Sequence, residues 1–200
     1  MSQKHTPANA LEDIFLQSMS AHNAVMRQVK TLEDLMQHTV DTCVDIIRND
    51  GKLLICGNGG SAADSQHFAA EIVGRFRKER RPWPAVALTT DSSVLTAVGN
   101  DYGFDEIFAR QVEGIGRPGD ALIGISTSGN SPNILNAVQT ARKMGIFTIG
   151  LLGRDGGTVA KEMDLPLIVK TQDTARIQEA HIFLIHCIAG GIEVRLMEQA

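Results

Sequence analysis

Short apolar runs alternate with helix-length segments through most of the chain. The runs cover residues 53–56, 85–88, 121–126, 147–152 and 165–169. Each run is followed by a turn and a helical pattern, an order typical of βαβ units and of a parallel sheet covered on both faces. We therefore predict an α/β fold, a three-layer αβα sandwich with a five-stranded parallel sheet.

Both ends of the chain have helical periodicity instead. Between residues 9 and 49, apolar side chains recur at helical spacing in two stripes, which begin near Leu11 and Leu32, and Gly51 marks the stop. A last helix, about 175–196, is apolar nearly all round and needs burial on every side. We predict that residues 1–50 are a helical extension packing on the core and on neighbouring subunits. Residues 51–200 form the α/β domain, within one structural domain overall.

The first candidate site follows the first strand. Residues 57–61, Gly-Asn-Gly-Gly-Ser, form a turn that lets backbone N–H groups approach an anion at a helix N-terminus. The helix that follows carries His67 and Glu71 four residues apart, so that both side chains lie on one face. An anion-binding turn, a nitrogen ligand and a carboxylate within nineteen residues outline an active site.

A second candidate site follows the third strand. Ser126, Thr127, Ser128 and Ser131 place four hydroxyl groups within six residues, and Pro132 suits the first turn of the next helix. An ordinary turn with Ser131 as the N-cap needs only one of these hydroxyls. Because ligands of open parallel sheets bind at the carboxyl ends of the strands, we predict that this segment binds a phosphate group.

The last helix carries a third group of polar side chains. A buried histidine needs partners for its ring nitrogens, and two of the six histidines, His181 and His186, fall in this apolar helix. With Gln178, His67 and Glu71 available, a metal or catalytic role is the better interpretation of His186. His181 is interpreted as structural.

Asn100 and Asp101 follow the second strand region. Together with the neighbouring glycines they are first of all a turn signal. Because the carboxyl ends of parallel strands carry the ligand site, contact with a substrate hydroxyl is equally consistent with their place in the chain.

Composition narrows the class of protein. The 200 residues are 43% hydrophobic and 21% charged, with a net charge of −4, which is typical of a soluble globular protein and gives no nucleic-acid surface. No apolar run reaches the ~18 residues that span a membrane. Three scattered cysteines fit a reducing cytoplasm. The partial dinucleotide fingerprint at residues 57–62 lacks the acidic residue expected about 20 positions later, and no P-loop occurs.

These clusters resemble, in order and over nearly the whole chain, the bacterial phosphoheptose isomerases of the sugar isomerase (SIS) fold group. Residues 56–61, 67–71, 99–101, 124–131 and 176–186 carry the resemblance. It implies a SIS domain with flavodoxin-like strand order. It also implies an isomerase that converts D-sedoheptulose 7-phosphate to D-glycero-D-manno-heptose 7-phosphate, the first step of ADP-heptose biosynthesis for lipopolysaccharide. The expected form is a cytoplasmic homotetramer with active sites at subunit interfaces.

The resemblance further implies roles for individual residues. Glu71 and His186 would be the catalytic pair. One zinc ion per subunit would be held by His67, Glu71, Gln178 and His186. Substrate contacts are implied for Asn58, Gly59, Gly60, Glu71, Asn100, Asp101, Ser126, Thr127, Ser128, Ser131 and Gln178.

The chemistry of these residues suits an aldose–ketose isomerase. A proton moves between adjacent carbons through an enediolate, which needs a base for both carbons and a positive centre beside the oxygen. Glu71 is the candidate base, His186 moves protons on the oxygens, and zinc would polarise the carbonyl. Eight residues separate Gln178 from His186, about 12 Å along an ideal helix and roughly 80° around it. We therefore favour a site built across a subunit interface over leaning side chains or an irregular helix.

Three other functions remain as alternatives. A non-catalytic SIS protein that binds the replication initiator DnaA would share the fold, the tetramer and the serine segment, but would lack the carboxylate of Glu71. A phosphosugar sensor would bind its ligand without turnover. Another phosphosugar isomerase, such as an arabinose 5-phosphate enzyme, fits the motifs poorly. The presence of Glu71 beside a full ligand set favours the phosphoheptose isomerase.

Overall fold

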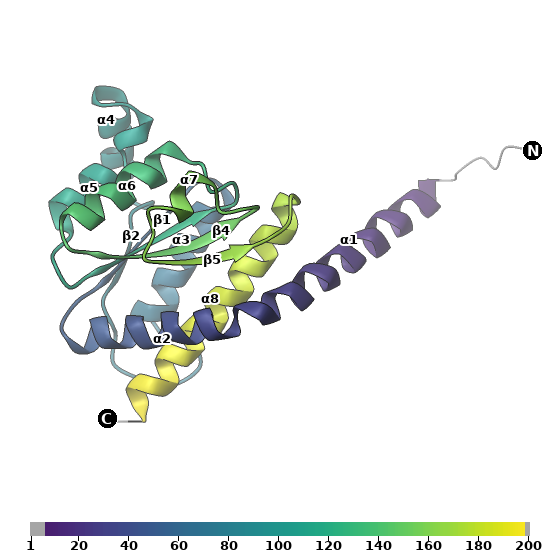
Figure 1. Ribbon diagram of the computed structural model, residues 1–200, viewed down its shortest axis with the longest axis horizontal. Helices are drawn as coiled ribbons and strands as arrows, with labels where there is room; N and C mark the ends of the chain where they lie inside the picture. The colour runs from purple at the N-terminus through teal and green to yellow at the C-terminus, as the bar shows by residue number, and fades with distance from the viewer. Residues whose placement is uncertain (1–6, 199–200) are drawn as a thin grey trace, which may run out of the picture.

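The computed structural model describes the backbone of residues 7–198 and the side chains of residues 11–198. Its centre is a five-stranded parallel sheet in the order β2-β1-β3-β4-β5 (Figure 1). This is the flavodoxin-like order, so the predicted fold class is confirmed. The strands are β1 (Leu53–Gly57), β2 (Ala85–Ala87), β3 (Ala121–Ser126), β4 (Phe147–Gly153) and β5 (Leu165–Val169).

Helices cover both faces of the sheet. Alternate residues of β1 show why: Leu53 and Ile55 join a core with α2, α3 and α8, whereas Leu54 and Cys56 join a second core with α5 and α6. Both faces of the strand are therefore apolar, as a doubly covered parallel sheet requires. The helices are α1 (Pro7–Val29), η1 (Lys30–Leu32), α2 (Glu33–Arg48), α3 (Gly60–Val73), α4 (Ser92–Asp101), η2 (Phe104–Glu106), α5 (Ala109–Ile115), α6 (Pro132–Lys143), α7 (Gly157–Ala160) and α8 (Thr174–Met197).

Helix α8 is the central helix of the first core. By length and composition it could cross a membrane, and it is the one helix among the described residues that could. In the structure it packs against α2, α3 and the strands β4 and β5, with residues such as Ile177, Ile185 and Ile192 fully buried. Its hydropathy is therefore that of a core helix. Burial is not complete on every side, because Phe183 remains 44% exposed.

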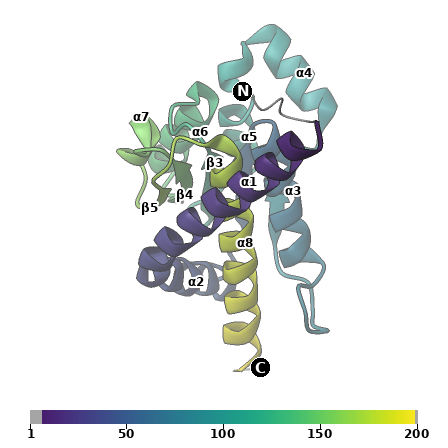
Figure 2. The ribbon, with the colours of Figure 1, turned by 90° about the vertical axis from the view of Figure 1, so that its right-hand side faces the viewer.

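Helix α1 projects away from the sheet (Figures 1 and 2). Its C-terminal half is attached to α8, since His22 Nδ1 lies 2.8 Å from Glu179 Oε2 and Arg176 donates to the Ser18 carbonyl at 2.9 Å. Its predicted apolar stripe is largely exposed, although Phe15 and Met19 border a pocket that they share with Arg176 and Glu179 of α8. The exposed apolar side chains of α1 are Leu11, Ile14, Phe15, Leu16 and Met19. Packing of this extension on neighbouring subunits stays a prediction, as does the division at residue 50.

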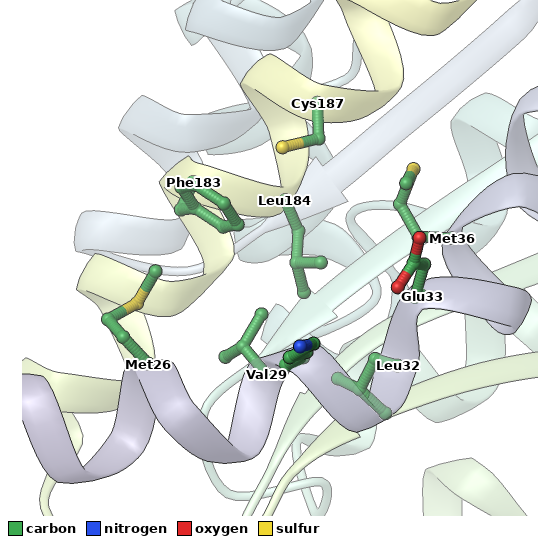
Figure 3. A pocket seen from close by; sticks show the side chains of 9 residues that line it. Met26, Val29, Leu32, Glu33, Met36, Phe183, Leu184 and Cys187 are labelled. Carbon is green, nitrogen blue, oxygen red and sulfur yellow. The ribbon is translucent and has the colours of Figure 1, made fainter.

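An apolar groove lies where α1 and α2 meet α8. Figure 3 shows Phe183, Leu184 and Cys187 of α8 facing Met26 and the residues that follow it. The groove has a volume of about 270 Å³.

Candidate active site

The glycine turn is built as the sequence predicts. β1 ends at Gly57, and Gly59, with φ of 57°, immediately precedes α3. A side chain at Gly57 would collide with the backbone of Ser61, so the turn needs glycine for its close approach to the helix. The turn places backbone groups at the positive N-terminal end of α3, where an anion is favoured.

The serine segment forms a second concave loop between β3 and α6. The Ser126 hydroxyl is 2.9 Å from that of Ser131 and 3.5 Å from that of Ser128, and it accepts a hydrogen bond from the Gly129 N–H. Ser131 is the N-cap residue of α6, as expected, but its side chain makes no capping hydrogen bond. Its hydroxyl turns toward Ser126 instead, and the hydroxyls gather inside the loop.

The two loops lie side by side. Asn58 of the glycine turn and Asn133 of α6 exchange two side-chain hydrogen bonds of 2.8 and 2.9 Å. Asn133 is 1% exposed, and no sequence pattern singled it out. The pairing fixes the relative position of the two predicted phosphate-binding segments at the carboxyl end of the sheet.

Gln178 lies at the same end of the molecule. A side chain at Gly60 would collide with the Gln178 amide, so this amide rests directly on the first turn of α3. Gln178 therefore lies beside the glycine turn, in a position suited to substrate contact. His186 is eight residues further along α8, about 12 Å away along the helix axis.

His67 and Glu71 of α3 converge with His186 of α8. Each contributes one ligand atom, and these atoms lie within 4.8 Å of one another. The Nε2 atoms of the two histidines are 2.9 Å apart, and Glu71 Oε1 is 3.3 Å from His67 Nε2. The side chain of His67 is 44% exposed and that of Glu71 18%, so the cluster opens to solvent.

The spacing of this cluster fits a zinc ion. Two ligand atoms on one tetrahedral zinc, each about 2.0–2.1 Å from the metal, lie about 3.3 Å apart. The 3.3 Å between His67 and Glu71 has this value, and the 2.9 Å between the histidines would open by a few tenths of an ångström. Three of the four predicted ligands are thus gathered by one chain. The fourth predicted ligand, Gln178, has its amide against Gly60 at the first turn of α3.

Asp64 lies one turn before His67 on α3. Burial raises the pKa of its carboxyl group, and the nearby His67 opposes that rise. Its Oδ2 atom is buried without a hydrogen-bond partner in the described part of the chain. Sequence reasoning did not select Asp64, although its negative charge favours a cation beside His67.

Asn100 and Asp101 lie apart from these groups in the chain. They end helix α4, which projects beyond the sheet in Figure 1, and the Asn100 amide donates to the Asp101 carboxylate at 2.8 Å. No hydrogen bond joins either residue to the other predicted site residues within residues 11–198. Their expected contact with substrate stays a prediction.

His181 is buried in the core, as its structural interpretation requires. It is 0% exposed, and burial lowers its pKa to about 4 even though the nearby Leu152 carbonyl raises it slightly. Neither ring nitrogen makes a hydrogen bond of acceptable geometry to the described residues. The expectation that a buried histidine finds partners is therefore not met.

Known proteins share both the sequence and the fold. The family model of the SIS domain matches residues 17–153. Phosphoheptose isomerase of Geotalea daltonii is 52% identical over 177 residues, which are 88% of this chain and 92% of the relative. The chain belongs to the phosphoheptose isomerase family of SIS-domain proteins. The match to the family model begins inside α1, so part of the helical extension belongs to the matched region.

Solved structures of phosphoheptose isomerases have the same architecture. The protein from Neisseria gonorrhoeae is 46% identical and superposes with a TM-score of 0.85 over 94% of this chain and 100% of its own. That from Francisella tularensis is 37% identical, with a TM-score of 0.86 over 94% and 98%. The phosphoheptose isomerase fold therefore includes the projecting α1 as well as the sheet.

Proposed function

We propose that this protein isomerises D-sedoheptulose 7-phosphate to D-glycero-D-manno-heptose 7-phosphate, the first step of ADP-heptose biosynthesis. The observation that carries the proposal is the convergence of Glu71 with His67 and His186 in a chain that belongs to the phosphoheptose isomerase family. Phosphate would bind at the glycine turn and the serine segment, at the carboxyl end of the sheet.

The distance between the start and the middle of α3 supports a long substrate. Gly60 and His67 are seven residues apart, about 10 Å along the helix. A heptose phosphate in extended form, with carbon–carbon bonds of about 1.5 Å, has a similar length between its first carbon and its phosphorus. The phosphate-binding turn and the reacting carbons can therefore be served by one substrate molecule.

Glu71 would act as the base on the substrate carbons. Its Oε1 atom faces His67 at 3.3 Å, which leaves Oε2 to take a proton from one carbon and return it to the neighbouring carbon. His186, within the same cluster, would move the proton between the two oxygens and assist ring opening. This division gives each step of the enediolate route a group of suitable chemistry.

We propose zinc as the metal of this cluster. His67, Glu71 and His186 offer two nitrogens and one oxygen, a donor set that zinc accepts. A bound zinc ion would polarise the substrate carbonyl and stabilise the negative oxygen of the enediolate. The fourth ligand in the proposal is Gln178 of a neighbouring copy, because Gln178 of the same chain rests on Gly60.

A homotetramer with interface active sites follows from the same reasoning. The exposed apolar stripe of α1 and the groove of Figure 3 provide surface for a second copy of the chain. Asn100 and Asp101, which project on α4, would reach the site of a neighbouring copy. We place the enzyme in the cytoplasm, where the free thiols of Cys43, Cys56 and Cys187 would stay reduced.

Turnover of the proposed substrate tests this function directly. The purified protein is incubated with sedoheptulose 7-phosphate and the product is followed by NMR, with and without a zinc chelator. We expect formation of the heptose phosphate, a lower rate with chelator and recovery when zinc is restored. An absence of turnover under every condition would contradict the isomerase and favour a phosphosugar sensor or a DnaA-binding protein.

A further inference from the structure

Glu193 is a buried carboxylate outside the proposed catalytic cluster. It lies on α8, seven residues or two turns beyond His186, and is 2% exposed. Its two oxygens accept hydrogen bonds from three successive backbone N–H groups, those of Phe76, Arg77 and Lys78, at 3.0 to 3.3 Å. One side chain of α8 therefore holds the segment that leaves α3.

Arg80, in the same segment, connects Glu193 to the end of α3. Its Nε lies 3.3 Å from Glu193 Oε1, as an ion pair rather than an aligned hydrogen bond, and both side chains are 3% exposed. Its other nitrogens donate to the carbonyls of Glu71 at 2.7 Å and Ile72 at 2.9 Å. The guanidinium thus satisfies the last carbonyls of the helix that carries Glu71, and it stacks on Trp83 at 3.7 Å.

Phe76 connects the same segment to His186. The two rings are stacked, with centroids 5.6 Å apart and an angle of 23° between their planes. Because the Phe76 N–H is bound to Glu193, the carboxylate fixes the backbone from which this ring projects. The orientation of the His186 imidazole therefore depends on a residue two turns away.

We propose that Glu193 and Arg80 are positioning residues, which hold Glu71 and His186 in their reactive arrangement through the segment 74–80. The proposal rests on the proposed isomerase function. Arg80 acts on Glu71 through its hydrogen bond to the Glu71 backbone carbonyl. Glu193 acts on His186 through the backbone and ring of Phe76. One ion pair thereby sets the relative position of a carboxylate on α3 and an imidazole on α8.

The charges of the pair make it hard to replace. Burial favours the protonated form of Glu193, but the three backbone donors and Arg80 together outweigh it and keep the pKa of this carboxyl below its usual value. A glutamine at position 193 would offer one acceptor oxygen and would turn an N–H group toward backbone N–H donors. A lysine at position 80 would keep the charge but could not donate to several carbonyls as a planar fork does.

The test combines NMR of the metal-free protein with steady-state kinetics. Histidine is isotopically labelled, and the His186 ring signals are assigned from their absence in His186→Gln. Phe76→Leu gives the signals without the shielding of the stacked ring. In Glu193→Gln we expect the His186 signals to move toward the Phe76→Leu positions. We also expect kcat to fall roughly 10- to 100-fold, with KM little changed, the size of effect seen for residues that orient a metal ligand.

Glu198→Gln is the matched control, because Glu198 is an exposed residue at the end of the same helix. It should leave both the His186 signals and kcat unchanged. Arg80→Lys repeats the test if Glu193→Gln does not fold. Unchanged His186 signals in folded variants would overturn the proposal, even if their melting temperature falls. If the wild type does not turn over the sugar phosphate, the proposed function fails. The NMR measurement still tests whether Glu193 and Arg80 set the position of the His186 ring.

Discussion

Glu71 faces His67 with one carboxylate oxygen, and in the proposed mechanism its other oxygen is the base. Glu71→Gln preserves the size of the side chain but removes the basic oxygen. We expect kcat to fall roughly 10²- to 10⁴-fold, the usual contribution of a general base. Sugar phosphate should still bind, because the glycine turn and serine segment are untouched, and isothermal titration calorimetry would measure this. A fully active Glu71→Gln enzyme would remove Glu71 from the mechanism.

His181 makes the folded state sensitive to acid. Its folded pKa of about 4 lies below the ordinary value of 6.5, so the unfolded chain takes up a proton first as the pH falls. This stability is fully present above about pH 6.5 and is lost between pH 6.5 and 4, by up to about 3 kcal/mol. Urea unfolding of wild type and His181→Leu across this range measures the difference.

We expect the His181→Leu protein to lose less stability than wild type between pH 6.5 and 4. His38→Gln is the control, since His38 is exposed and its replacement should leave the wild-type slope unchanged. Equal slopes in wild type and His181→Leu would contradict the assignment. A weaker dependence of stability on pH in His181→Leu would show that the unpaired buried imidazole is tolerated in the core only in its neutral form.

Single residues also mark the limit of sequence reasoning. His67, Glu71 and His186 were selected from spacing and residue type, and the structure brings their ligand atoms together. Asn133 and Glu193 were not selected, because an asparagine in a helix and a glutamate near a chain end have no distinctive pattern. Their importance arises from partners 75 and about 115 residues away in sequence, which only the folded chain reveals.

At the scale of elements, the glycine turn and the start of α6 act as one unit. Asn133→Ala would leave the Asn58 amide without its partner in a partly buried place. We expect a loss of about 1–3 kcal/mol in the free energy of unfolding and a higher KM for the sugar phosphate. Denaturant unfolding and steady-state kinetics measure the two effects. The control is Gln139→Ala on the same helix, which should change neither the stability nor the KM. An unaltered KM in Asn133→Ala would show that the Asn58–Asn133 pair has no part in substrate binding.

The elements themselves were largely predictable. All five predicted strands occur within one residue of their expected bounds, because a doubly covered parallel strand reads as a continuous apolar run. The last helix was expected at about 175–196 and spans Thr174–Met197. Ser131 is the N-cap residue of α6 as expected, but its hydroxyl contacts Ser126 within the loop rather than the helix backbone. The local sequence pattern determines where an element lies. Contacts within and between loops determine which groups form the hydrogen bonds at its end.

At the scale of the whole molecule, the projecting α1 points to assembly. Phe15 is 64% exposed on the apolar face of this helix. A buried aspartate at this position would be costly, so Phe15→Asp should dissociate the oligomer and lower turnover. Light scattering measures the mass and the kinetic assay the activity. Gln17→Asp, at a polar exposed position of α1, is the control and should keep the wild-type mass.

Two outcomes would contradict the assembly. A wild-type protein that is monomeric at assay concentration would exclude the tetramer. A dissociated Phe15→Asp protein with full activity would show that one chain contains the complete site. Loss of both the oligomer and the activity would support the proposal that a neighbouring copy completes the site, with its Gln178 as the fourth ligand.

The sequence alone determined the fold class, the places of the glycine turn and the serine segment, and the choice of His67, Glu71 and His186, whose ligand atoms cluster. These features depend on hydrophobic periodicity and on short spacings, both of which are local and readable along the chain. Tertiary structure alone decided that Asn58 pairs with Asn133, that Gln178 lies beside the turn, and that Glu193 binds the backbone of the segment after α3. Such contacts join segments far apart in sequence, and only packing of α3, α6 and α8 on one sheet brings them together.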